Sequence, residues 1–315
     1  MTSKSELQTQ VDALFKKAFD DKLAPEFQWA VFDKDDILTS GALGNTGVAP
    51  DAKPVTEDTL YWIASTAKVG VSLIVLHILE RGLAKDGTSL KDLDDPAAVL
   101  RHLPELDPNS PNWASKIITG FESAPDPVTG KLVPIVRPKK TVPTLRHFLT
   151  HTAGFGYYWT SPLHVKWWKG DPSIGAKPLG ELPFVTGKIS DVDTPCLYES
   201  GEVFEYSPSL DWAGIWCARA TGKSLVELHE EILFKPLGIS GQALVHVGPT
   251  RQKNKAAVFV PDGQGGFNET PFDVWSCAGY PPEGYQHFGS APVWSSHRAY
   301  ARVYQAVLRK DESEC

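Results

Sequence analysis

Cysteine is scarce in this chain. Its 315 residues include four cysteines, Cys196, Cys217, Cys277 and Cys315, and no two of them form a C-x-x-C pair. Disulfide-dependent domains and zinc modules both use dense, regularly spaced cysteines. The spacing here therefore predicts neither a disulfide framework nor a zinc site. A chain of this length buries enough surface to fold without such supports.

Long apolar runs and a strong charge bias are also missing. No stretch of about 20 apolar residues could span a bilayer, and the first residues, MTSKSELQTQVDAL, are too polar for a signal peptide. The formal net charge of −7 argues against nucleic-acid binding and against a basic membrane-binding patch. We therefore expect a soluble, cytoplasmic protein that binds neither nucleic acid nor membrane.

Hydrophobic periodicity predicts mixed helices and strands. Residues 5–22 have the pattern of an amphipathic helix, and residues 27–33 and 36–44 that of two strands joined by a tight acidic turn. Further helices are expected at 65–81, 142–154, 207–222, 224–238 and 295–309. The sequence contains no internal repeat and no linker that clearly separates two domains.

The run YWIASTAKVGVS, residues 61–72, places one lysine in an otherwise uncharged stretch. Ser-x-x-Lys alone is weak evidence, because it arises by chance and an exposed helical lysine is the simpler interpretation. Here the helix after Lys68 is apolar nearly all round, which indicates a buried position. Residues three apart share a helix face, so Lys68 can reach the Ser65 hydroxyl. A buried lysine without its proton can activate a serine nucleophile.

Tyr206 is the second candidate for chemistry. It lies in SGEVFEYSPSLDWAG, directly before the helix expected at 207–222. A lone tyrosine is more often part of the core. At this place, however, its side chain can project from a loop into a cleft, where a phenol near an amine can act as general acid and base.

Five segments carry a family resemblance, and they follow one another along the chain. They are ASTAK (64–68), LRHFLTHTAGF (145–155), GEVFEYSPSLDWAG (201–214), FKPLGI (234–239) and GSAPVWSSHRAYARV (289–303). Together they resemble the class C β-lactamase-type serine hydrolases, and most closely the esterase and fungal acyltransferase (transesterase) branch. Joint coincidence of five segments in the family's order is implausible.

The resemblance implies an α+β fold of the β-lactamase and transpeptidase type. In that fold a mostly helical lobe lies beside an antiparallel sheet flanked by helices. Residues 1–83 would hold the N-terminal helix, the first strands and the nucleophile helix. Residues 84–240 would form the helical lobe, and residues 241–315 would return toward the sheet.

The resemblance also implies roles for three residues. Ser65 would be the nucleophile, Lys68 its activating partner, and Tyr206 the general acid and base. The family's β-lactamases have Tyr-x-Asn where this chain has Tyr206-Ser207-Pro208. The missing amide points to ester or thioester substrates rather than lactams.

A second departure from the family concerns the end of the chain. A third motif on a late strand should follow the helix at 295–309, but only DESEC follows. The HFG sequence at 287–289 precedes that helix, so it is a poor candidate for the motif. We therefore expect the sheet to be incomplete at the C-terminus.

Aromatic residues between 155 and 168 are the best candidates for substrate contact. Core packing is the alternative, but nearby glycines, a proline and a lysine favour a loop over a cleft, whose aromatic wall would suit an apolar acyl group. The substrate-binding candidates are Tyr157, Tyr158, Trp159, Trp167 and Trp168.

Other motifs point away from competing chemistry. His147 and His151 lie four apart, but the glutamate of a zinc-protease helix is missing, so we interpret both as structural. No G-x-S-x-G sequence occurs, which argues against an α/β-hydrolase. The expected mechanism needs neither a metal nor an organic cofactor.

The sequence therefore predicts a serine hydrolase or acyltransferase of secondary metabolism. It would pass an apolar acyl group through an acyl-serine intermediate to water or to an alcohol. Its partners would be small molecules, with an acyl-carrier thioester among the candidate donors. The alternative is a catalytically impaired binding protein or truncated pseudoenzyme of the same fold; a true β-lactamase or peptidase is less favoured. The oligomeric state is left open.

Overall fold

The computed structural model describes residues 3–179, 188–245, 254–269, 289 and 293–309. The chain forms two compact units, each assembled from segments that are distant in sequence. None of the described helices combines the length and the apolar character that crossing a membrane requires. The first unit comprises Met1–Gly70, Val226–Pro282 and Ala291–Cys315, and the second comprises Val71–Leu225 and Glu283–Ser290.

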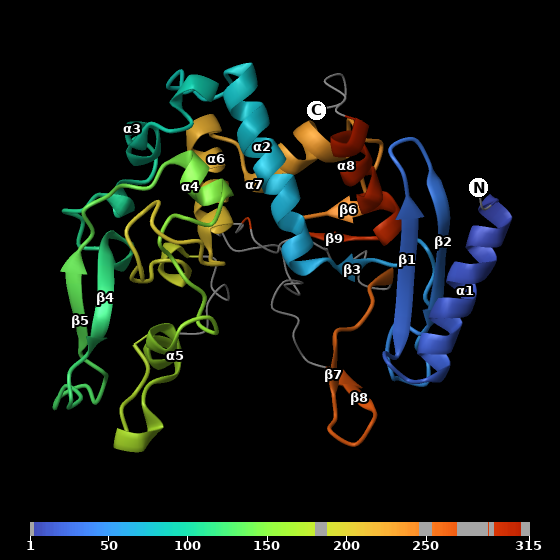
Figure 1. The fold of residues 1–315 in the computed structure, drawn as a ribbon, viewed down its shortest axis with the longest axis horizontal. Helices are drawn as coiled ribbons and strands as arrows, with labels where there is room; N and C mark the ends of the chain where they lie inside the picture. The colour runs from blue at the N-terminus through green and yellow to red at the C-terminus, as the bar shows by residue number, and fades with distance from the viewer. Residues whose placement is uncertain (1–2, 180–187, 246–253, 270–288, 290–292, 310–315) are drawn as a thin grey trace. The chain divides into compact units, whose positions relative to one another are not determined.

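A two-stranded hairpin is the framework of the first unit (Figure 1). Its strands β1 (Glu26–Phe32) and β2 (Ile37–Gly44) pair antiparallel, as the sequence predicts. The Asp33 carboxylate holds the turn, because it accepts the backbone N–H groups of Asp35 and Asp36 at 2.8 and 2.7 Å. The acidic turn expected from the sequence is thus an aspartate-capped one.

Helix α1 (Lys4–Asp20) packs against this hairpin. The Phe15 ring of α1 stacks on Trp29 of β1, with centroids 4.3 Å apart. The Trp29 indole in turn lies flat over Gly41 of β2, where an added Cβ would come within 2.2 Å of the ring. Because Gly41 has no side chain, the Trp29 ring can lie against β2 and stack on Phe15.

Gln28 of β1 joins three segments of the first unit. Its buried amide nitrogen donates to the carbonyl oxygens of Thr56 and Thr59 at 2.7 and 3.1 Å. Its amide oxygen accepts the backbone N–H of His297 at 2.7 Å, at the first residue of α8 (His297–Arg309). The hairpin, the segment before residue 61 and the start of α8 are thereby fixed to one another.

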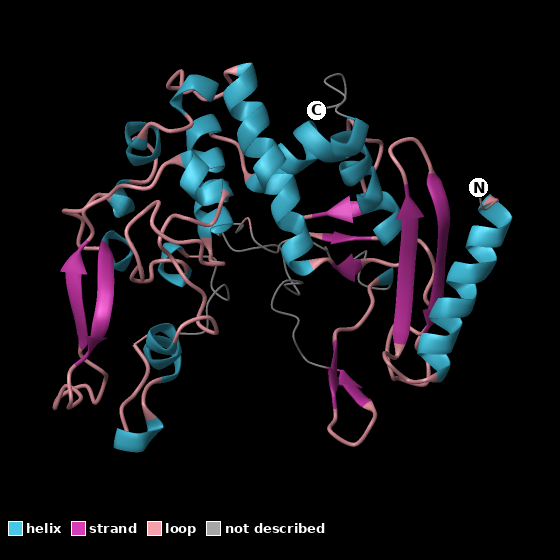
Figure 2. Ribbon diagram, in the orientation of Figure 1, coloured by secondary structure: helices cyan, strands magenta, loops and turns pink. Residues whose placement is uncertain are grey.

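Short strands complete the first unit (Figure 2). A three-stranded antiparallel sheet has the order β3-β9-β6, and a separate hairpin pairs β7 with β8. Their bounds are β3 (Tyr61–Trp62), β6 (Ala243–Leu244), β7 (Phe259–Pro261), β8 (Phe267–Glu269) and β9 (Trp294–Ser295).

Helix α6 (Ser209–Thr221) is the centre of the second unit. Trp212 and Trp216 on it are completely buried, and the Phe155 ring stacks on Trp212 with centroids 6.1 Å apart. The helix ends at Gly222, whose φ of 70° is the left-handed conformation that glycine adopts freely. The predicted stop is confirmed.

Helix α4 packs against α6. Helix α4 covers only five residues, fewer than the sequence predicts, because Thr144 caps its start and His151, with a φ of 54°, turns the chain just past its end. The chain's remaining described α-helices and strands are α2 (Lys68–Arg81), α3 (Pro96–Leu100), α4 (Leu145–Leu149), α5 (Pro162–Lys169), α7 (Leu225–His229), β4 (Lys116–Phe121) and β5 (Pro134–Pro138).

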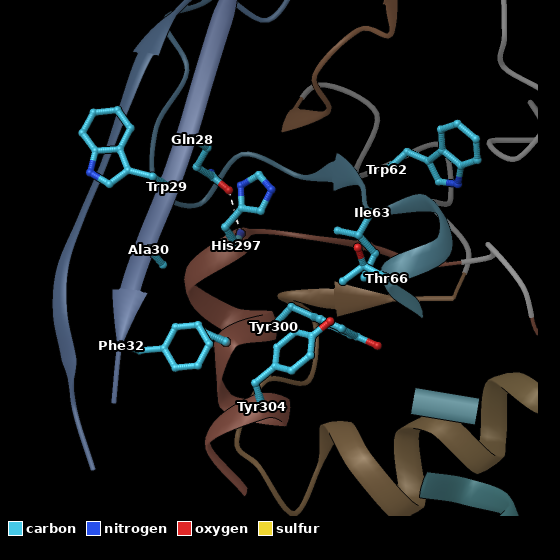
Figure 3. A pocket seen from close by; sticks show the side chains of 11 residues that line it. Gln28, Trp29, Ala30, Phe32, Trp62, Ile63, Thr66, His297, Tyr300 and Tyr304 are labelled. Atoms are coloured by element: carbon cyan, nitrogen blue, oxygen red, sulfur yellow. Dashed lines mark hydrogen bonds between the residues drawn. The ribbon is translucent and has the colours of Figure 1, made fainter. Parts of the chain in front are cut away.

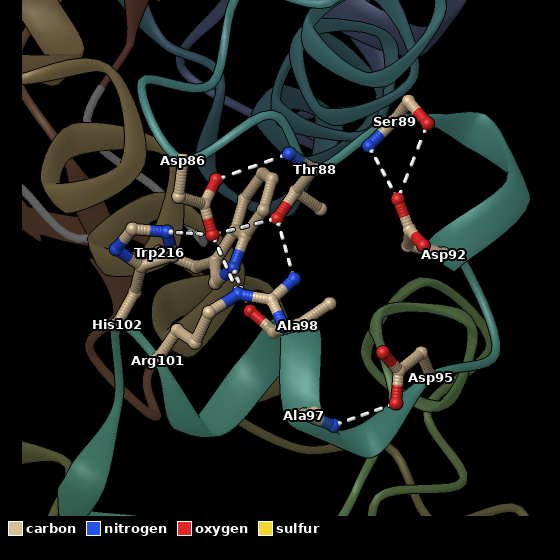
Figure 4. Close-up of polar contacts among 10 residues, drawn as sticks. All are labelled: Asp86, Thr88, Ser89, Asp92, Asp95, Ala97, Ala98, Arg101, His102 and Trp216. Atoms are coloured by element: carbon tan, nitrogen blue, oxygen red, sulfur yellow. Dashed lines mark hydrogen bonds and ion pairs between the residues drawn. The ribbon is translucent and has the colours of Figure 1, made fainter.

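The Asp86 carboxylate centres a polar network in the second unit (Figure 4). It accepts the Thr88 N–H and hydroxyl at 3.1 and 2.8 Å, and Arg101 Nε at 2.6 Å. His102 Nε2 lies 3.1 Å from the same carboxylate. Burial raises the Asp86 pKa, but the hydrogen bonds from Thr88 and Arg101 outweigh it and hold the pKa well below its usual range.

Glu26, the first residue of β1, is a buried carboxyl. Its side chain is 7% exposed, and its Oε2 has no hydrogen-bond partner among the described residues. Burial raises its pKa to about 8, with the Tyr61 phenol acting against this and the Glu269 charge adding to it. Glu26 is therefore mostly protonated in the folded protein near neutral pH.

We expect Asp86→Asn to lower the free energy of unfolding by about 1–3 kcal/mol at pH 7, because the amide loses the charge that Arg101 and Thr88 bind. The stabilisation by ionised Asp86 is complete above its ordinary pKa and is lost progressively as the pH falls from about 4 toward its lower folded pKa, so this difference should shrink in that range. Urea unfolding at pH 7 and pH 3 measures both effects. The control is Asp51→Asn at an exposed position; equal losses in the two variants would contradict the assigned role.

We expect Glu26→Gln to change how stability depends on pH. Because the folded state raises the Glu26 pKa from 4.5 to about 8, wild-type stability should fall as pH rises through that window. The glutamine variant has no proton to lose there. The free energy of unfolding of the variant, relative to that of the wild type, should therefore increase by a few kcal/mol up to about pH 8 and then level off. Parallel pH–stability curves would contradict this.

Candidate active site

Ser65 lies on a one-turn 3-10 helix, Ala64–Ala67, that links β3 to α2. The sequence places Ser65 in the first turn of an α-helix, but α2 itself begins at Lys68. Tighter 3-10 turns are common at helix N-termini. Ala64 has a φ of 46°, a left-handed conformation that costs an alanine about 1–2 kcal/mol. Such strain directly before a serine is typical of functional sites.

The Ser65 hydroxyl and the Lys68 amine are hydrogen-bonded. Lys68 Nζ donates to Ser65 Oγ at 3.1 Å. The Lys68 side chain is buried, 8% exposed, whereas Ser65 is exposed. A serine open to substrate thus lies against an amine held out of water. This geometry permits proton transfer between the two atoms.

A pocket of about 420 Å³ in the first unit borders this segment (Figure 3). Thr66, next to Ser65, forms part of its wall, and most other wall residues are aromatic or apolar. Burial lowers the pKa of His297 and raises that of Tyr300, so both are neutral near pH 7. The lining is Gln28, Trp29, Ala30, Phe32, Trp62, Ile63, Thr66, His297, Tyr300, Ala301 and Tyr304.

Tyr206 belongs to the second unit and lies in the loop before α6, as the sequence predicts. Its half-buried ring meets two others. The His151 ring is tilted against it at 4.8 Å between centroids, and the Tyr157 ring at 5.3 Å. Tyr206 is therefore positioned by ring packing from two sides.

The two histidines that the sequence analysis interprets as structural differ in their surroundings. His147 Nδ1 accepts the Thr144 N–H at 3.1 Å, which closes the cap of α4, and burial lowers its pKa. His151 instead lies beside Tyr206, and its Nδ1 accepts the Ser207 N–H at 3.3 Å. Sequence reasoning missed this neighbour of Tyr206, because 55 residues separate them and no local spacing signals the contact.

The five aromatic candidates do not form one group. Tyr157 stacks on Trp159 at 4.3 Å, and Tyr158 meets Trp159 edge-on at 4.5 Å, so these three rings continue the cluster at Tyr206. Trp159 is 54% exposed, whereas Tyr157 is only 4% exposed and is as buried as a core residue. We call Tyr157, Tyr158, Trp159 and Tyr206 the aromatic cluster.

The other two aromatic candidates lie on α5. Trp167 is 3% exposed and packs edge-on against Trp113, with centroids 4.7 Å apart. Trp168 is half-buried on the same helix. Of the two, Trp167 thus has the surroundings of a core residue.

The described residues also bear on metal binding and on the end of the sheet. No three histidine, cysteine, aspartate or glutamate side chains in the described ranges are grouped so that they could hold a metal ion. The HFG motif at 287–289 lies mostly outside the described residues, and DESEC at 311–315 lies wholly outside them.

Comparison with known proteins agrees with the resemblance seen in the sequence. Relatives include Acyltransferase mokF of Monascus pilosus, 27% identical over 82% of this chain and 55% of its own length. Monacolin J acid methylbutanoyltransferase of Aspergillus terreus is 26% identical with the same coverage. Esterase EstB of Burkholderia gladioli is 28% identical over 90% of this chain and 67% of its own length. The chain thus spans about half the length of the two acyltransferases.

A solved structure shares the fold. An Aspergillus terreus simvastatin synthase variant superimposes with a TM-score of 0.75 at 24% identity, over 97% of this chain and 68% of its own. The fold is accordingly of the β-lactamase and transpeptidase type, with mixed helices and antiparallel sheets, as predicted. The Beta-lactamase family model matches residues 11–314. The chain therefore belongs to the β-lactamase family.

Proposed function

We propose that this protein is a serine-dependent acyltransferase or esterase that works through an acyl-serine intermediate. The observation that carries the proposal is the 3.1 Å contact between the buried Lys68 amine and the exposed Ser65 hydroxyl. The names of the relatives, an acyltransferase, a methylbutanoyltransferase and an esterase, support the same class of reaction.

In the first half of the reaction, Lys68 acts on Ser65. The unprotonated amine takes the hydroxyl proton while Oγ attacks the carbonyl carbon of the acyl donor. The Ser65 backbone N–H supplies one hydrogen bond to the oxyanion that forms. The leaving group takes up a proton, and the acyl group stays on Oγ.

In the second half, water or an alcohol takes the acyl group, and Lys68 returns its proton to Ser65 Oγ as the acyl bond breaks. Tyr206 is the proposed general acid and base: it protonates the leaving group in the first half and deprotonates the acceptor in the second. The contact with His151 and the bond from Ser207 to His151 support a fixed position for the phenol.

The proposed substrate is an ester or thioester with an apolar acyl group. The exposed Trp159 of the aromatic cluster supports this, because an exposed aromatic ring binds apolar groups well and carries no charge. The relative named a monacolin J acid methylbutanoyltransferase supports a role in secondary metabolism. An acyl-carrier thioester is one proposed donor. Pro208 stands where an asparagine would bind a lactam side chain, so lactams are disfavoured.

Replacement of Ser65 or Lys68 should abolish acyl transfer. We expect Ser65→Ala and Lys68→Met to lower the rate with a p-nitrophenyl ester by on the order of 10³-fold or more each, because nucleophile and base act as a unit. Ser72→Ala, on α2 one turn after Lys68, is the control. Mass analysis of quenched protein should find the acyl label on Ser65.

A fluorophosphonate label distinguishes the enzyme from an inactive binding protein of the same fold. Wild-type protein should be labelled on Ser65, and Lys68→Met should be labelled far more slowly. Label on another serine, with Ser65→Ala still active, would overturn the proposal. Complete lack of labelling in folded wild-type protein would favour the binding protein.

Tyr206→Phe should fold normally but lose on the order of 10²–10⁴ in kcat, because only the phenolic hydroxyl, which carries the transferred proton, is removed. The control is Tyr198→Phe, a half-buried tyrosine of the same unit. Thermal unfolding of both variants separates lost chemistry from lost stability. An unchanged kcat with intact folding would assign Tyr206 to packing alone.

A further inference from the structure

Lys139 carries a buried charge with no carboxylate partner. Its side chain is 2% exposed, just past the end of β5. Nζ donates to the Ala153 carbonyl at 2.5 Å and lies 5.4 Å from the centre of the Phe155 ring. In the described part of the chain no carboxylate lies within ion-pair distance of Nζ. An ammonium buried in this way is costly unless another group compensates it.

The side chain that can compensate this charge, as a thiolate, is that of Cys196. Lys139 Nζ lies 3.5 Å from Cys196 Sγ, and the cysteine is completely buried. Burial raises the pKa of the Cys196 thiol, and the Lys139 charge acts in the opposite direction. Burial is the larger effect, so the pKa of the thiol lies above its usual value. The amine stabilises the thiolate when it forms, and the thiolate is the form of cysteine that reacts with peroxide.

We propose that Lys139 and Cys196 form an oxidative modification site, at which hydrogen peroxide joins Sγ to Nζ by a covalent sulfur–nitrogen bond. The chain of evidence is the direct contact of the two atoms, their shared burial and the uncompensated charge of the amine. None of it depends on the proposed acyl transfer.

The chemistry balances with one peroxide per cross-link. The Cys196 thiolate attacks one peroxide oxygen and becomes a sulfenic acid, while the O–O bond breaks and releases hydroxide. Hydroxide takes a proton from the Lys139 ammonium and leaves as water. The neutral amine then attacks the sulfenic sulfur, the S–O bond breaks, and a second water departs. The protein loses two hydrogen atoms and gains no oxygen.

The cross-link removes the buried positive charge but keeps the local hydrogen bond. Its nitrogen retains one hydrogen, which can still bond to the Ala153 carbonyl. The link would close a loop between positions 57 apart in sequence. Cross-links of that span stabilise mainly by restricting the unfolded chain. It would tie Cys196 to Lys139, whose Nζ bonds to the Ala153 carbonyl. The neighbouring Leu197 N–H already donates to the Gly154 carbonyl at 2.7 Å.

The test uses the full chain with Cys277 and Cys315 replaced by serine, treated with hydrogen peroxide. Digestion without reductant should yield one joined peptide pair that contains positions 139 and 196, lighter by two hydrogens than the sum of its parts. Dithiothreitol should separate it. The melting temperature should rise on oxidation and return on reduction.

Two variants and an internal control test whether the cross-link requires both Lys139 and Cys196. Cys196→Ser preserves an acceptor for Lys139, and Lys139→Met removes the amine; neither should form the link or show the melting shift. Cys217 is equally buried, and no described lysine is bonded to its sulfur, so it should stay reduced. Peroxide adducts on Cys196 without a cross-link, or equal oxidation of Cys196 and Cys217, would overturn the proposal.

Discussion

The buried amide of Gln28 is the interaction on which the first unit depends. An amide out of water must satisfy both its ends, and Gln28 does so with the backbone of residues 56–59 on one side and the start of α8 on the other. Residues 56–59 lead into β3 and from there to Ser65. Because this path is short, the hydrogen bonds of one side chain on β1 limit how far the serine can move within its unit.

The candidate residues Ser65 and Tyr206 lie in different units and depend on two different physical devices. At Ser65 the device is electrostatic: an amine held away from water beside an exposed hydroxyl. At Tyr206 it is geometric, since His151 and Tyr157 hold the ring by packing. The first device depends on local helical spacing, whereas the second depends on contacts between segments far apart in the chain.

This difference explains what the sequence could predict. The three-residue spacing of Ser65 and Lys68 on a helix predicts their contact. The hydrophobic periodicity of residues 27–33 and 36–44 predicts the hairpin of β1 and β2, so both features follow from local sequence patterns. The partner of Tyr206 does not, because His151 reaches it only through the fold. Trp167 likewise resembles its aromatic neighbours in sequence, yet it packs edge-on against Trp113. Composition cannot separate such a ring from one that is open to a ligand.

The left-handed backbone at Ala64 also limits which substitutions natural variation can accept at that position. At a φ of 46° a side chain that branches at Cβ meets the backbone, whereas glycine carries no such penalty. Glycine, and to a lesser degree asparagine or aspartate, should therefore be tolerated at position 64, whereas valine and isoleucine should not. Selection at position 64 should thus act on backbone shape rather than on side-chain chemistry.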